Sequence, residues 1–110
     1  MPTINIFYND PSLESQLNEV CYDLKVFITK VLSGVDVSLD ANEISVRLVG
    51  VAGTGMLADV ELEITAHAFD ERVKKQDEIC LKTREFLKAR LKAGEVRVWL
   101  LLPQLGHSWE

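Results

Sequence analysis

Histidine and cysteine are scarce in this sequence, which has two of each among 110 residues. Cys21 and Cys80 stand in separate apolar stretches without a Cys-x-x-Cys spacing. The chain thus has few residues that could bind zinc or form a disulfide framework. We expect both cysteines to pack in the core. Neither His67 nor His107 stands at a recognisable catalytic spacing from a nucleophile or a carboxylate. We therefore expect a function that needs no metal.

Long apolar runs and an excess of positive charge are also lacking. No run of 18 apolar residues is present, and the first residues lack the basic and apolar regions of a secretory signal. Seventeen acidic residues against twelve basic ones leave a net charge of -5, which argues against general binding to nucleic-acid phosphates. We expect a cytoplasmic protein that binds neither membranes nor nucleic acid.

Linkers rich in proline or glycine are absent, and 47% of the residues are hydrophobic, so residues 1–110 read as a single globular domain. Apolar residues alternate with polar ones in three segments, which predicts β-strands at residues 3–8, 44–51 and 59–68. We predict a fourth strand at residues 96–102. The glycines between residues 50 and 55 form no phosphate-binding loop, because no Lys-Ser/Thr pair and no helix follow them. We interpret this segment as a turn.

Apolar residues at spacings of three and four predict two helices. The first runs over residues 11–33, with Asp10 as its cap, Pro11 at its first position and Gly34 at its end. The second begins at the cap Asp70 and ends just before Gly94.

The two halves of the chain match each other when overlaid. An offset of 59 residues pairs Cys21 with Cys80 and Phe27 with Phe86, so the sequence reads as two βαβ units in tandem. Each unit requires a right-handed crossover that places its helix on one face of the sheet. We predict an α+β fold of the order β-α-β-β-α-β, with a four-stranded mixed sheet and both helices on one face.

The other face of this sheet mixes large apolar side chains with polar ones. We expect symmetric self-association to cover this face and to complete a small-molecule site between subunits. The residues expected there include Asn5, Phe7, Ser45, Arg47, Thr65, Trp99 and Leu101.

The first residues, Met1-Pro2-Thr3-Ile4, resemble the start of tautomerase-superfamily proteins, in which the methionine is removed and the proline becomes an N-terminal base. The segment Ser45-Val46-Arg47-Leu48, followed by a glycine-containing loop, is similar to the corresponding part of 4-oxalocrotonate tautomerase. Arg97-Val98-Trp99 resembles the Arg-Val-Tyr of the macrophage migration inhibitory factor family. The length and the tandem layout are similar to that family and to 5-carboxymethyl-2-hydroxymuconate isomerase.

This resemblance implies a cofactor-independent tautomerase or isomerase that acts on a small 2-oxo or 2-hydroxy-dienoic acid, as a homotrimer. It implies that Pro2 is the catalytic base, that Arg47 binds the substrate carboxylate and that Trp99 lines the pocket. Two positions depart from the pattern: the loop at residues 34–37 lacks the pocket lysine of the inhibitory factor, and Leu101 stands in place of its asparagine.

The chemistry of these residues fits such a reaction. An N-terminal proline is a secondary amine whose conjugate acid loses its proton more readily in low-dielectric surroundings and near a cation. Arg47 can supply the cation, hold a carboxylate with two hydrogen bonds and stabilise a developing enolate. We expect parallel neighbouring strands to place Pro2 and Arg47 on one face of the sheet. A retained Met1 would turn the amine into an amide without basicity.

Other interpretations remain open at this point. The chain can be a non-catalytic oligomeric module, either a degenerate relative of the tautomerases or a ferredoxin-like binding domain with the same coarse order of elements. Arg47 can be a strand residue that pairs across a hairpin with Glu61 or Glu63, and Trp99 can be an anchor in a core or an interface.

Overall fold

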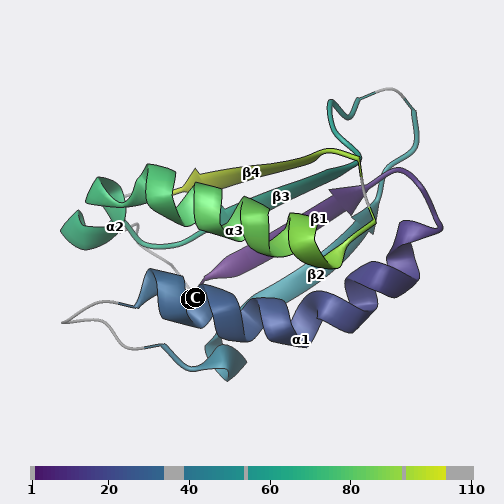
Figure 1. The fold of residues 1–110 in the computed structure, drawn as a ribbon. Coiled ribbons are helices and arrows are strands. Elements are labelled where there is room, and N and C mark those ends of the chain that lie inside the picture. Colours follow the sequence, from purple (N-terminus) through teal and green to yellow (C-terminus); the bar gives the residue numbers. More distant parts are fainter. Residues whose placement is uncertain (1, 34–38, 54, 93, 104–110) are drawn as a thin grey trace, which may run out of the picture.

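The computed structural model describes residues 2–33, 39–53, 55–92 and 94–103. Its strands are β1 (Thr3–Tyr8), β2 (Ser45–Gly50), β3 (Val60–Thr65) and β4 (Val96–Leu101) (Figure 1). The helices are α1 (Leu13–Leu32), α2 (Asp70–Lys74) and α3 (Gln76–Arg90), and a short 3-10 helix η1 (Ala41–Glu43) precedes β2. The order of the main elements is the one that the sequence predicts.

The four strands form one sheet in the order β2-β1-β3-β4. β1 is parallel to β2, β3 is parallel to β4, and the two central strands β1 and β3 are antiparallel. The chain is therefore built from two βαβ units joined into a mixed α+β sheet, which confirms the predicted fold class. A ferredoxin-like fold would separate the first two strands by another strand, so the adjacency of β1 and β2 excludes that alternative.

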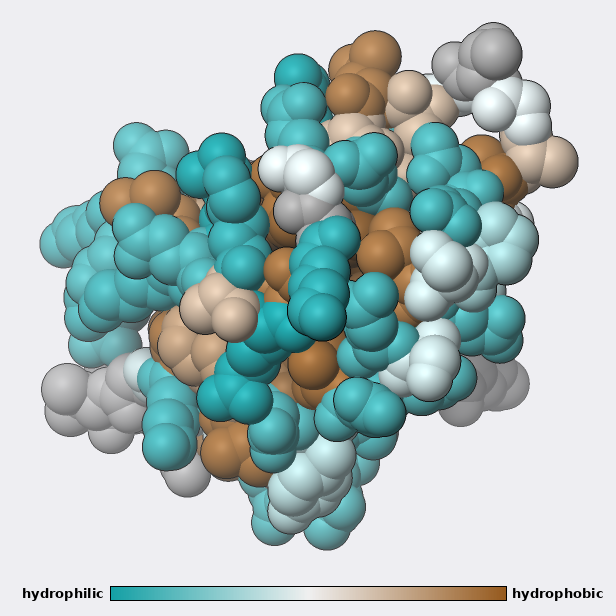
Figure 2. Space-filling view, turned by 45° about the vertical axis from the view of Figure 1, so that its right-hand side comes forward, coloured by the Kyte–Doolittle hydropathy of each residue, from teal (hydrophilic) through white to brown (hydrophobic). Residues whose placement is uncertain are grey.

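One face of the sheet carries the core. Alternate residues of the strands are buried there, because successive side chains of a strand point to opposite faces. Both long helices lie over this face in Figure 1, and α1 places a continuous apolar stripe against it. The fully buried residues of this core include Ile4, Ile6, Leu17, Leu24, Ile28, Leu62, Ile64 and Leu87. On the face seen in Figure 2, hydrophobic side chains form small areas between polar ones, as is usual where a surface contacts water.

The second predicted helix is divided in two. Lys75 has backbone angles of φ -105° and ψ 14°, so α2 ends before it and α3 begins after it. Arg72 of α2 is buried and donates hydrogen bonds to the carbonyls of Leu32 (3.1 Å) and His67 (3.0 Å). The bond to Leu32 joins the short helix to the end of α1. A local sequence pattern does not predict such a contact between distant segments.

The predicted caps differ in detail from the observed ones. Asp10 forms a turn before α1, since its carboxylate accepts a hydrogen bond from the Ser12 N–H at 3.0 Å, and the helix begins at Leu13. Phe69, not Asp70, is the N-cap of α2. The expected end at Gly34 lies outside the described residues.

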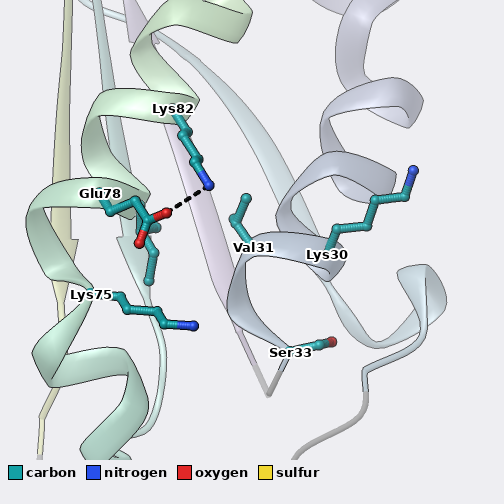
Figure 3. A pocket seen from close by; sticks show the side chains of 7 residues that line it. Lys30, Val31, Ser33, Lys75, Glu78 and Lys82 are labelled. Atoms are coloured by element: carbon teal, nitrogen blue, oxygen red, sulfur yellow. Dashed lines mark ion pairs between the residues drawn. The ribbon is translucent and has the colours of Figure 1, made fainter. Parts of the chain in front are cut away.

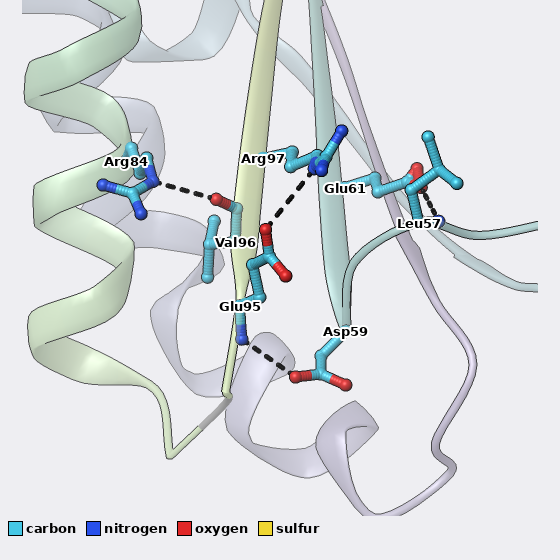
Figure 4. A network of polar contacts seen from close by, with 7 residues as sticks. All are labelled: Leu57, Asp59, Glu61, Arg84, Glu95, Val96 and Arg97. Atoms are coloured by element: carbon cyan, nitrogen blue, oxygen red, sulfur yellow. Dashed lines mark hydrogen bonds and ion pairs between the residues drawn. The ribbon is translucent and has the colours of Figure 1, made fainter.

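Polar contacts fix the start of the β3–β4 pair (Figure 4). The Asp59 carboxylate accepts a hydrogen bond from the Glu95 N–H at 2.9 Å, and the Arg84 guanidinium donates to the Val96 carbonyl at 3.1 Å. Arg84 thereby covers a carbonyl of the edge strand β4. Among the described residues, no helix has the length and the apolar composition needed to cross a membrane.

Candidate functional site

Pro2 lies immediately before β1 and is buried. Its carbonyl accepts a hydrogen bond from the Ser45 N–H at 3.2 Å, which fastens the beginning of β1 to the beginning of β2. Pro2 follows the alternation of β1, in which Ile4 and Ile6 are buried and face the helices. An amine at this position would therefore have little water around it.

Arg47 lies in β2 opposite Asn5 of β1, on the sheet face that no helix covers, and its side chain is exposed. The other four arginines are held by contacts: Arg72 and Arg84 donate to backbone carbonyls, Arg90 pairs with Asp23, and Arg97 pairs with Glu95. Among the described residues, Arg47 has no such hydrogen bond or ion pair. Its guanidinium is thus available to an external carboxylate.

The alternative interpretation of Arg47, an ion pair with Glu61 or Glu63 across a hairpin, is wrong. β1 lies between β2 and β3, so Arg47 is not on a strand adjacent to these glutamates. Glu61 instead accepts a hydrogen bond from the Leu57 N–H at 2.8 Å (Figure 4).

Trp99 lies in the edge strand β4 and is 40% exposed. The register places it opposite Glu63 of β3, which in turn is opposite Asn5. Arg47, Asn5, Glu63 and Trp99 therefore form one row across the open face. Three strand spacings separate the ends of this row, so the Arg47 and Trp99 backbones lie about 14 Å apart.

Within one chain, the structure separates Pro2 from Arg47, in contrast to the expectation of a shared face. The register pairs Thr3 with Ser45, and Arg47 lies two residues further along β2, about 7 Å beyond. Pro2 is on the buried side, whereas Arg47 is on the open side. The three residues implied by the resemblance are thus not gathered in a single chain.

Two further polar side chains belong to this row, and the sequence did not predict them as site residues. Asn5 and Glu63 are both half-buried and stand between Arg47 and Trp99. The alternation of polar and apolar residues predicts that Glu63 lies on the polar face of its strand. That it shares a row with Arg47 follows only from the strand order and the register.

Within the part of the chain that the structure describes, few side chains are placed for metal or redox chemistry. Among the described residues, no group of three or more His, Cys, Asp or Glu side chains could hold a metal ion. Cys21 and Cys80 are both half-buried, and burial raises the pKa of each thiol. At neutral pH these thiols are mainly protonated and weakly nucleophilic. Cys80 packs against the core, as the sequence predicts.

Comparisons with known proteins show which solved structures share this fold. No protein-family model and no curated protein sequence matches the chain. A macrophage migration inhibitory factor-like protein from Entamoeba histolytica is similar in structure, with a TM-score of 0.66 and 11% identity over 97% of this chain and 95% of that one. The protein crystallised as native Ps01740 gives a TM-score of 0.67 and 14% identity, over 98% and 99% of the two chains. Both similarities extend over nearly the whole length of each chain, so the chain has the fold that these two proteins share.

Proposed function

We propose that the protein is a cofactor-independent tautomerase or isomerase that moves a proton on a small 2-oxo or 2-hydroxy-dienoic acid. The observation that carries the proposal is the pair of Pro2, buried where β1 begins, and Arg47, which has no ion pair among the described residues. The fold supports it, because a macrophage migration inhibitory factor-like protein shares it over almost its whole length.

In this proposal the nitrogen of Pro2 becomes an amine when Met1 is removed. Burial disfavours its charged form, so the amine is unprotonated and basic near neutral pH. It accepts a proton from the substrate carbon next to the carbonyl, and the electron pair of the broken C–H bond forms an enolate. The proton then returns to oxygen or to another carbon, so the reaction is an isomerisation without net oxidation.

Arg47 stabilises the negative charge of the substrate. A guanidinium can hold a carboxylate through two parallel hydrogen bonds, and it attracts the charge that develops on the neighbouring enolate oxygen. Both interactions strengthen where water is excluded. Trp99 supplies an apolar wall for such a pocket.

A second copy of the chain is needed to complete this site. Pro2, Arg47 and Trp99 lie apart within one chain, and Arg47 and Trp99 occupy the two edge strands of the sheet. Copies that meet edge to edge would bring a β2 strand of one chain beside a β4 strand of the next. We propose a homotrimer in which neighbouring subunits contribute these residues to one site.

The test is an enol–keto assay with phenylpyruvate and with hydroxymuconate. We expect Pro2→Ala to lower kcat/KM about 100-fold, because it removes the secondary amine that acts as the base. Arg47→Ala should lower kcat/KM about tenfold, mainly through KM, because it removes a charged contact with the carboxylate. The matched control is Arg97→Ala, an arginine on the same face that already pairs with Glu95 at 3.6 Å.

Unchanged rates in both Pro2→Ala and Arg47→Ala would remove these residues from the mechanism. The intact mass of the protein is measured on the same samples. A mass that includes Met1, together with no activity, would favour the second candidate, a non-catalytic oligomeric module, because an acylated Pro2 cannot act as a base. The observation behind this candidate is that Pro2 and Arg47 lie on opposite sides of the sheet within one chain.

A further inference from the structure

A hollow of about 260 Å³ lies on the helical side of the molecule, between the end of α1 and the beginning of α3. Val31 and Ser33 line it from α1 and the residue after it, and Lys75, Glu78 and Lys82 line it from the other side. In Figure 3, the Lys75 and Lys82 side chains extend into the gap between the two helices, whereas the Lys30 ammonium at the rim points away. The hollow is separate from the open face of the sheet.

The charged groups in the hollow are only partly paired. The Lys82 ammonium lies 2.7 Å from the Glu78 carboxylate, and this contact is the main reason why the pKa of Glu78 is lowered. Lys75 adds a smaller effect of the same sign. Among the described residues, Lys75 has no carboxylate within ion-pair distance. One ammonium in the gap is therefore left to other anions.

Arg72 adds a buried positive charge beside this hollow. It is 4% exposed and lines a recess of about 10 Å³ that shares Val31, Ser33 and Lys75 with the hollow. Its Nε and one Nη donate to carbonyls, and its guanidinium lies 4.8 Å from the centre of the Phe69 ring. Within the described part of the chain, no carboxylate pairs with it.

A buried cation without a counter-ion is unfavourable. Contacts with the carbonyl end of α1 compensate only about half a charge, since that is the size of the helix dipole charge. Burial accordingly lowers the pKa of Arg72. The position of Arg72 is explained by the carbonyls that it binds, but its charge is not balanced by them.

Among the residues that the structure describes, four cations and two carboxylates line the hollow and the recess, and only the Lys30 ammonium is seen to point away (Figure 3), in a chain whose net charge is -5. The cations are Lys30, Lys75, Lys82 and Arg72, and the carboxylates are Glu71 and Glu78. The first turn of α3 borders the same hollow, and its N-cap residue Lys75 provides no side-chain cap. Uncapped N–H groups at a helix start favour negative charge.

We propose that this hollow binds the phosphate group of a small phosphomonoester. A phosphate carries close to two negative charges at neutral pH and offers three oxygen acceptors, which suits a hollow bordered by the cations Lys75, Lys82 and Arg72. Inorganic phosphate alone would leave part of the 260 Å³ unused, whereas the hollow has room for a small organic group.

The test measures binding to the full chain by calorimetry at constant ionic strength. The probes are glycerol 3-phosphate, inorganic phosphate and acetate. We expect glycerol 3-phosphate to bind most tightly, inorganic phosphate more weakly, and acetate at least about tenfold more weakly than phosphate.

Three variants locate the site. Lys75→Gln should weaken glycerol 3-phosphate binding about fivefold, since it removes the ammonium that has no described counter-ion. Glu78→Gln should strengthen binding, because it removes the carboxylate that competes with the ligand for Lys82. Lys88→Gln, an exposed lysine further along α3, is the matched control and should bind as the unmodified protein does.

Three results would overturn the proposal: no phosphate binding at millimolar concentration, equal loss in Lys75→Gln and Lys88→Gln, or weaker binding in Glu78→Gln. Equal affinities for inorganic phosphate and glycerol 3-phosphate would show that the organic group is not recognised and would overturn the phosphomonoester. Far-UV circular dichroism of each variant separates these results from unfolding. None of these outcomes depends on tautomerase activity.

Discussion

At the scale of single residues, the contacts of the arginines distinguish those that serve the fold from Arg47, the candidate for ligand binding. Arg72 and Arg84 satisfy backbone carbonyls, and Arg90 lies over the Phe86 ring, 4.3 Å from its centre, while it pairs with Asp23. Arg47 makes no comparable contact with a described residue. An arginine that the fold does not use is a reasonable candidate for ligand binding.

Gly94 provides a prediction at this scale. A Cβ atom built on Gly94 would lie 2.6 Å from a carboxylate oxygen of Asp59, the oxygen that accepts the hydrogen bond from the Glu95 N–H. Gly94→Ala should therefore displace Asp59 and lower the free energy of unfolding by about 1 kcal/mol, the usual worth of one hydrogen bond. Urea unfolding measures the change.

A double-mutant cycle identifies the cause of that loss. In an Asp59→Ala background the clash and the hydrogen bond are both absent, so Gly94→Ala should have almost no effect on the free energy of unfolding. A loss of the same size in both backgrounds would show that the cost arises elsewhere in the turn.

At the scale of elements, the helices hold the fold through their apolar faces. In α1 the residues that point to the sheet are buried at spacings of three and four, and the Phe27 ring of α1 stacks on the Phe86 ring of α3 at a centroid distance of 4.5 Å. The two helices are thus joined to each other as well as to the sheet. Their exposed faces contribute far less to stability.

The buried and the exposed face of α1 predict different losses in the free energy of unfolding when a side chain is shortened to alanine. Leu24 is fully buried, so Leu24→Ala should lower the free energy of unfolding by about 2–5 kcal/mol through lost burial and a cavity. The neighbouring Tyr22 is 68% exposed, so Tyr22→Ala should change it by less than about 1 kcal/mol. Equal losses in chemical denaturation would contradict the assignment of the buried face.

At the scale of the whole molecule, the described helices cover one side of the sheet only (Figure 1). The open face carries the charged and aromatic row described above, and the exposed apolar residue Leu101 lies in the same strand as Trp99. The edges of the sheet are β2 and β4, and an edge strand can pair with another chain, although Arg84 covers the Val96 carbonyl of β4. Both features favour the proposed association of copies.

The oligomeric state in solution tests the proposed association of copies. If copies meet through the open face and the edge of β4, Trp99→Glu combined with Leu101→Glu should shift the protein from trimer to monomer, because two charges would be buried in the interface. Leu81→Glu on α3, at a residue that is 53% exposed, is the control and should remain trimeric. Native mass spectrometry distinguishes the states, and a monomeric unmodified protein would contradict the proposed trimer.

The sequence by itself determined the elements and their order. Strands alternate with period 2 and helices with a period near 3.6, so the strand at residues 3–8 and the stripe of α1 follow from local patterns. The match between the two halves of the sequence further predicted that the elements form two βαβ units. Pro2 and Arg47 were candidates because the segments around them resemble those of known proteins, and such a resemblance is a property of the sequence.

Only the tertiary structure decided which residues meet. The strand order excluded a ferredoxin-like sheet and an Arg47 ion pair with the glutamates of β3, and the register placed Asn5 and Glu63 between Arg47 and Trp99. The break at Lys75 and the burial of Arg72 depend on the end of α1, forty residues away in the chain. Such contacts arise from packing between distant segments, and the local periodicity of a sequence carries no information about them.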